Sequence, residues 1–179
     1  MRAIVINLLL LFCAVTAHAY SADSLYSLAL NWSNDRSESV PLSSFEGRDV
    51  IVVMVYTSCR SVCPLIVSKL KSIERAAAEQ RRKTEFVLIS LDPKNDTPQV
   101  LAAFRKRENL PHESWHLLVG TEQDTRKFSN LIGFSYQKNT GSGEIMHSNK
   151  ITLLNAQGEI SHVLEGLNED ISPLMERLK

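Results

Sequence analysis

Two cysteines, Cys59 and Cys63, and one histidine, His147, are the side chains in this sequence best suited to chemistry. Three residues separate the cysteines, and a disulfide across so short a loop adds little stability, because the closure entropy that a cross-link removes grows with loop length. Thiolates bind soft ions such as Cu(I), and an imidazole suits copper as a further ligand. The pair therefore indicates a metal site or a redox-active dithiol rather than a structural disulfide.

The residues around the pair predict a turn between a strand and a helix. The β-branched run 51–55 is typical of a strand buried on both faces, and Pro64 is favoured in the first turn of a helix. The positive end of that helix, reinforced by Arg60, is expected to lower the pKa of both thiols. Residues four apart on a helix hold their Cβ atoms about 5 to 6 Å apart, wider than the roughly 3.5 to 4.5 Å of a disulfide. A metal ion bridges this gap more easily.

The hydrophobic pattern predicts alternating strands and helices along the rest of the chain. The expected strands are 51–55, 86–89, 115–119, 150–155 and 159–164, and the expected helices begin near 62, 97, 121 and 168. The apolar residues of the first two helices, which are expected to face the core, are Val62, Leu65, Ile66, Leu70 and Ile73, and Val100, Leu101 and Phe104. This order predicts an α/β, thioredoxin-like fold with a central mixed sheet flanked by helices. We also expect an extra N-terminal hairpin from 25–32 and 39–42, and a late β-hairpin near the metal site.

Residues 1–19 have the pattern of a signal peptide. An apolar run over 3–15, interrupted only by Asn7, is followed by Ala17-His18-Ala19, which has the small-x-small form of a cleavage site. The run is too short for a good membrane span, which needs about 20 apolar residues. We therefore expect export to the periplasm, removal of Cys13 with the signal, and a single domain over 20–179 without a stable membrane span. An uncleaved N-terminal tether is the alternative.

The charge balance excludes one class of partner. The chain has 20 basic and 20 acidic residues, and loss of Arg2 with the signal leaves 19 basic residues and a formal charge of −1. A chain so close to neutral has no basic excess for binding nucleic acid. No nucleic-acid partner is expected.

Several segments together resemble the Sco/SenC family, copper proteins of the thioredoxin superfamily that help build the copper A centre of cytochrome oxidase. The segments 45–48, 55–64, 90–98 and 147–148 occur in the family's order and at compatible spacing. The resemblance implies that Cys59, Cys63 and His147 bind copper, as Cu(I) or Cu(II). It also implies a partner: a copper-A-bearing oxidase subunit or another copper or thiol protein.

The chain departs from the family pattern close to these residues. Family members commonly have proline and aspartate between the cysteines, where this chain has Arg60 and Ser61, and many have aspartate before the histidine, where it has Met146. Fewer acidic groups make the pocket less favourable for a divalent ion, and this favours a thiol-redox role over copper delivery. The alternative function is therefore a thiol-disulfide reductase that keeps a partner's copper-ligand cysteines reduced. In it Cys59 attacks the partner disulfide and Cys63 resolves the mixed disulfide.

Other polar residues have less specific roles. His112, His116 and His162 lack a second ligand at useful spacing and are expected at the surface. Met146 is expected to pack in the core or at its rim, because neighbouring residues of an extended segment point to opposite sides. Asp92 and Asp96 have two open interpretations, as acids that support the site or as caps of turns around the prolines.

Overall fold

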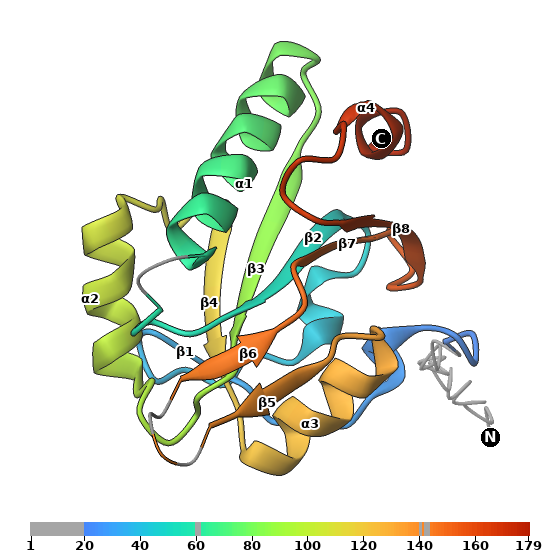
Figure 1. Cartoon of the computed structure of the whole chain (residues 1–179). Helices are drawn as coiled ribbons and strands as arrows, with labels where there is room; N and C mark the ends of the chain where they lie inside the picture. Colours follow the sequence, from blue (N-terminus) through green and yellow to red (C-terminus); the bar gives the residue numbers. More distant parts are fainter. Residues whose placement is uncertain (1–19, 60–61, 140, 142–143) are drawn as a thin grey trace, which may run out of the picture.

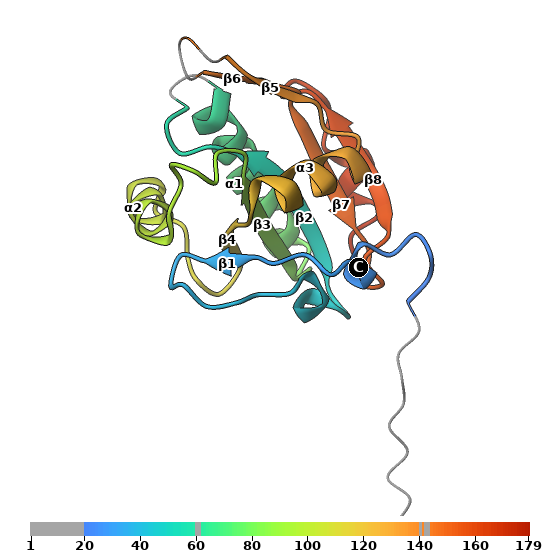
Figure 2. The same cartoon turned by 90° about the horizontal axis from the view of Figure 1, so that it is seen from below.

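Six strands form the central sheet in the order β1-β4-β3-β2-β7-β8 (Figures 1 and 2). The computed structural model describes residues 20–59, 62–139, 141 and 144–179. The strands are β1 (Ser33–Asn34), β2 (Asp49–Val55), β3 (Thr84–Ser90), β4 (Trp115–Val119), β7 (Lys150–Leu154) and β8 (Ile160–Glu165). β2, β3 and β4 run parallel, whereas β1, β7 and β8 are antiparallel to their neighbours. The predicted mixed α/β sheet is confirmed.

Helices connect and flank these strands. They are α1 (Val62–Glu79), α2 (Pro98–Glu108), α3 (Glu122–Leu131) and α4 (Ser172–Met175), with short 3-10 helices η1 (Leu25–Ser27) and η2 (Leu42–Phe45). The starts of α2 and α3 agree with the sequence, because the side chains of Thr97 and Thr121 each accept a hydrogen bond from the backbone N–H of the third residue of the helix. α1 and α4 contact each other, and Figure 1 shows them side by side.

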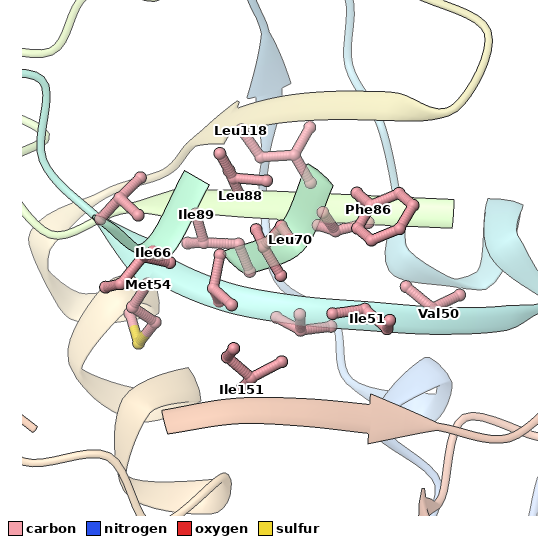
Figure 3. Packing of buried hydrophobic residues seen from close by; sticks show 14 of the residues in the cluster. Val50, Ile51, Met54, Ile66, Leu70, Phe86, Leu88, Ile89, Leu118 and Ile151 are labelled. Atoms are coloured by element: carbon pink, nitrogen blue, oxygen red, sulfur yellow. The ribbon is translucent and has the colours of Figure 1, made fainter. Parts of the chain in front are cut away.

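The pairing of β2 with β3 forms the centre of the core. All seven residues of β2 are buried, and the two strands pair in parallel from Asp49 with Thr84 to Val55 with Ser90. Ile66 and Leu70 of α1 pack among the apolar side chains of these strands (Figure 3). The buried strand and the buried helix face together fix where the turn between them must lie.

Two expected core residues are instead exposed. Leu65 is 57% exposed and Val100 is 37% exposed. The buried stripe of α1 contains Cys63, Ile66, Val67 and Leu70, and at about 100° per residue Leu65 falls on the opposite side of the helix. Helical spacing predicted the helix correctly but assigned it too wide an apolar face.

The N-terminal hairpin prediction is wrong in extent. Residues 25–27 form a 3-10 helix, and β1 pairs with β4 rather than with a long partner strand. What remains of the hairpin is a bridge between Ser33 and Ser39 and a hydrogen bond from Val40 N to Trp32 O. Leu25, Tyr26 and Trp32 are all buried, so this segment covers the core as an irregular strap.

The predicted C-terminal hairpin and last helix are both present, but the helix begins at a different residue from the one predicted. β7 and β8 form the expected late hairpin, with a hydrogen bond from Asn155 N to Glu159 O at its turn. The last helix begins at Ser172 rather than near residue 168, because the Asp170 side chain accepts a hydrogen bond from Ser172 N and a proline follows.

A second, two-stranded sheet was not expected. It consists of β5 (Tyr136–Lys138) and β6 (Ile145–His147), which pair antiparallel. We call it the β5–β6 ribbon, and Figure 2 shows it beside the start of α1. Three-residue strands are too short to reveal an alternating pattern in sequence.

The described residues contain no helix long and apolar enough to span a membrane. The predicted signal peptide, 1–19, lies outside the described residues, as does Cys13.

A buried ion pair joins α2 to the segment after β1. Arg105 Nε and Nη2 donate to the two Asp35 carboxylate oxygens at 2.6 and 2.9 Å, and both side chains are almost fully buried. Arg105 Nη1 also donates to Trp115 O at 2.9 Å. One guanidinium thus connects α2, β4 and the N-terminal strap.

Replacing Asp35 with alanine is expected to lower the free energy of unfolding by about 3 to 5 kcal/mol, because the Arg105 charge stays buried without its partner. Urea denaturation of the metal-free protein measures the change. Glu38→Ala is the matched control, since Glu38 pairs with Arg36 at the surface and its loss should cost less than about 0.5 kcal/mol. Equal effects of the two substitutions would contradict the prediction.

Candidate metal centre

The turn between β2 and α1 holds both cysteines. Cys59 N donates to Tyr56 O at 3.2 Å, which closes the turn after β2, and Cys63 is the second residue of α1. Cys63 N lies 3.4 Å from Cys59 Sγ and donates to it. An N–H donor stabilises negative charge on the sulfur that accepts it. Both cysteines are thiols, buried in the predicted strand-to-helix turn.

His147 ends β6, on the other side of the site. Its Nδ1 lies 2.8 Å from the backbone carbonyl of Ser148. A carbonyl only accepts hydrogen bonds, so Nδ1 carries the ring proton and Nε2 keeps its lone pair. The Phe134 ring stacks on His147 at 5.8 Å between centroids, and the Tyr56 ring meets it edge-on at 5.9 Å. These contacts fix both the tautomer and the orientation of the imidazole.

The fold brings the two cysteines and the histidine into one cluster. One ligand atom from each of Cys59, Cys63 and His147 lies within 4.8 Å of the other two. Two donors bound to the same ion at about 2.3 Å are at most about 4.6 Å apart, so a small adjustment suffices. Two sulfurs and one nitrogen form a soft donor set that suits copper. The residues present therefore fit a copper ion.

Burial controls the protonation of Cys63. Cys63 is 1% exposed, and burial raises its pKa to about 12, with only partial opposition from a backbone hydrogen bond at Tyr56. The prediction that the helix start lowers the pKa of both thiols is thus wrong for Cys63, because loss of hydration outweighs the helix dipole. Arg60, the other group invoked for this effect, lies outside the described residues.

Asp96 supports the cysteine turn. Its carboxylate accepts hydrogen bonds from Thr57 N at 3.2 Å and from Ser90 Oγ at 2.6 Å. Burial raises the pKa of Asp96, against the effect of these donors. Asp96 therefore ties the residue two positions before Cys59 to the end of β3.

Asp92 supports the part of the site that carries His147. Its carboxylate pairs with Lys138 Nζ of β5 at 2.7 Å and accepts a hydrogen bond from Asn95 Nδ2 at 2.7 Å. Lys138 belongs to the ribbon that carries His147. Of the two interpretations left open by the sequence, these contacts favour acids that support the site, whereas the cap of α2 is Thr97.

The remaining predicted residues lie outside the cluster. Met146 is 61% exposed, so the expectation of core or rim packing is wrong, although its side chain and that of His147 do differ in exposure as an extended strand requires. His116 is half-buried on β4, where Nε2 lies 2.8 Å from a Glu85 carboxylate oxygen. His112 is exposed and His162 is half-buried.

Tyr56 and Phe134 are site residues that the sequence reasoning missed. Tyr56 stands three positions before Cys59 in the same turn, and this closeness was the available signal. Phe134 lies before the β5–β6 ribbon, so its place beside His147 depends on how the chain returns to the site.

A depression of about 450 Å³ adjoins Cys59. Its lining residues are Thr57, Ser58, Cys59, Pro64, Arg107 and Glu108. Arg107 Nη2 donates to Thr57 O at 3.2 Å and so borders the turn. This depression provides an approach from solvent to the cysteine side of the cluster.

Known proteins resemble this chain over most of its length. A SCO1 protein homolog of Bacillus subtilis is 22% identical over 131 residues, which cover 72% of this chain and 68% of that protein. A SCO1/SenC family lipoprotein from Bacillus anthracis is 25% identical, with a TM-score of 0.75 over 83% of this chain and 91% of that one. Arabidopsis thaliana ScoI with copper bound is 22% identical, with a TM-score of 0.72 over 82% of this chain and 91% of that one.

These structural likenesses confirm the thioredoxin-like fold expected from the sequence. The sequence model of SCO1/SenC matches residues 22–179, which include the cysteine turn, the loop after β3 and the β5–β6 ribbon. Because the match covers most of the chain, this protein belongs to the SCO1/SenC family.

Proposed function

We propose that this protein is an exported copper-binding protein that delivers copper to, or prepares, the copper site of a respiratory oxidase. The observation that carries the proposal is the convergence of Cys59, Cys63 and His147 within 4.8 Å. The family match and the copper held by the plant relative support the same metal.

The donor atoms favour copper over the other common thiolate metal. Structural zinc usually takes four protein ligands, whereas Cu(I) is satisfied by few soft ligands. Here Cys59 and Cys63 supply two sulfurs and His147 supplies Nε2, since its Nδ1 is engaged by the Ser148 carbonyl. The three side chains hold the ion, and the buried setting keeps water from competing for it.

Delivery then proceeds by ligand exchange. A donor atom of the partner enters through the depression beside Cys59 and replaces one sulfur on the ion, and further exchanges complete the transfer without any net change in the ion's charge. The partner is a copper-A-bearing oxidase subunit or another copper or thiol protein. The site lies on the periplasmic side if residues 1–19 act as the signal peptide for a domain over 20–179.

A thiol-disulfide reductase is the second candidate, because both cysteines are thiols and lie close together. The high pKa of Cys63 weighs against it, since a buried thiol that stays protonated at neutral pH resolves a mixed disulfide slowly. Copper binding replaces that proton with a metal ion, and the same burial keeps water from competing for the ion.

Titration with Cu(I) and Cu(II) is expected to give one copper per chain. Cys59→Ser and Cys63→Ser should abolish tight binding, and His147→Ala should weaken it more than about 100-fold, which is beyond the usual effect of a residue that only supports a ligand. Competition with a chromophoric copper chelator, under reducing and non-reducing conditions, measures the affinities.

His162→Ala is the control for this series, because His162 is half-buried on β8 and lies outside the cluster. Unchanged affinity in His147→Ala would remove the third ligand from the proposal. A wild-type protein that binds no copper but cycles readily between dithiol and disulfide would favour the reductase instead.

The apparent Cu(I) affinity is expected to rise at least tenfold per pH unit between about pH 6 and pH 8. The Cys63 pKa is raised to about 12, so its thiol is protonated throughout this range, and copper binds the thiolate only after the proton leaves. Competition titrations at several pH values, corrected for protonation of the chelator, give the slope. An affinity independent of pH would show that Cys63 is already ionised or does not bind.

A further inference from the structure

The β5–β6 ribbon carries a lysine on the side that faces the protein. Residues opposite each other in the ribbon share a side, so Lys138 lies on the side of Ile145, and Tyr136 on the side of His147. Ile145 and His147 are two residues apart on one strand and therefore point the same way. Ile145 is 3% exposed, whereas Met146, on the outer side, is 61% exposed. A lysine on the inner side is expected to pair with an acid.

Asp92 supplies this acid from the loop after β3. Lys138 Nζ donates to Asp92 Oδ1 at 2.7 Å, and Asn95 Nδ2 donates to the other carboxylate oxygen at 2.7 Å. The Asp92 side chain is 6% exposed and that of Lys138 is 39% exposed. The carboxylate is therefore a buried charge whose cation reaches it from the ribbon.

The backbone holds Asp92 next to the start of the cysteine turn. Leu91 N donates at 2.8 Å to the carbonyl of Val55, the last residue of β2, and Asp92 N donates to Ser90 Oγ at 3.0 Å. The cysteine turn begins directly after Val55. The ion pair thus joins the ribbon to the segment that places the two cysteines.

This connection assigns a role to the lysine. Building on the proposed copper function, we propose that Lys138 is a positioning residue: by pairing with Asp92 it holds the β5–β6 ribbon against the loop after β3 and so keeps His147 within reach of Cys59 and Cys63. Because Lys138 is partly exposed, salt screens the pair, and the position of His147 depends on ionic strength.

Three variants separate the charge from the bulk of the side chain. Lys138→Met removes the charge and keeps a side chain of similar size, whereas Lys138→Arg retains the charge as the conservative rescue. Asp92→Asn removes the charge of the partner. Asp92→Asn combined with Lys138→Met should have no larger effect than either substitution alone, because each of them already breaks the one pair.

Lys150→Met is the matched control. Lys150 Nζ forms an ion pair with Glu165 Oε1 at 2.8 Å, and the two residues lie opposite each other in β7 and β8 of the central sheet. The backbone pairing of these strands does not depend on the side chains. The control therefore removes the same kind of contact without changing the connection between the ribbon and the loop after β3.

The Cu(I) affinities show whether Lys138 acts through His147. Lys138→Met is expected to lower the affinity about tenfold, within the range usual for a group that orients a metal ligand. Lys138→Arg should recover most of this loss, and Lys150→Met should match the wild type. In the His147→Ala background, Lys138→Met should change nothing further, because the ligand that the lysine positions is already absent. An equal loss in both backgrounds overturns the positioning role.

A second readout uses the metal-free protein. The ring protons of His147 are shifted in NMR spectra by the rings of Tyr56 and Phe134, whose centroids lie 5.9 and 5.8 Å from that of the imidazole. At fixed pH, Lys138→Met is expected to move the signal of the His147 Cε1 proton toward that of an exposed histidine. Wild type should move in the same direction when salt is raised to about 1 M, where the screening length falls to about 3 Å, and Lys138→Met should not respond.

Failure of the positioning role and failure of the proposed function give different results. A His147 signal that is unchanged in Lys138→Met overturns the role of Lys138, whereas copper binding by the wild type leaves the proposed function intact. A wild type that binds no copper overturns the proposed function, and the signal of the metal-free protein still decides whether the ion pair positions His147.

Discussion

The parallel pairing of β2 with β3 is the constraint on which the rest of the site depends. β2 is buried along its whole length, so its end after Val55 is held firmly within the sheet. α1 packs its apolar stripe back onto the same strands. Cys59 and Cys63 are therefore placed by the packing of β2 and α1 in the core.

The histidine half of the site relies on smaller contacts. The β5–β6 ribbon is a separate two-stranded sheet, and it is joined to the loop after β3 by the ion pair of Lys138 with Asp92. The rings of Tyr56 and Phe134 then hold His147 over the cysteines. The cysteine half of the site thus rests on the hydrophobic core, whereas the histidine half rests on the contacts of a small ribbon.

Burial has opposite effects on the two chemical functions considered. It keeps the Cys63 thiol protonated, which slows disulfide exchange at neutral pH. A metal ion can replace that proton, and once bound it gains from the same exclusion of water. The surroundings of Cys63 thus favour a metal-binding role over a reductase, even though the sequence alone left both open.

The sequence by itself determined the local features of this protein. The β-branched run before Cys59, and Pro64 after Cys63, specify a strand-to-helix turn, because these preferences act within a few residues. The caps at Thr97 and Thr121 are likewise local, and both are present. The resemblance to the Sco/SenC family singled out His147 without showing what surrounds it.

Only the tertiary structure decided how distant segments meet. The ribbon strands are too short to leave a pattern in sequence, and the contacts of Tyr56 with His147 join segments far apart in the chain. The pKa of Cys63 depends on how completely the folded chain excludes water, which no local motif specifies. Spacing and residue type thus identified the cysteines, whereas packing determined their protonation and the neighbours of the histidine.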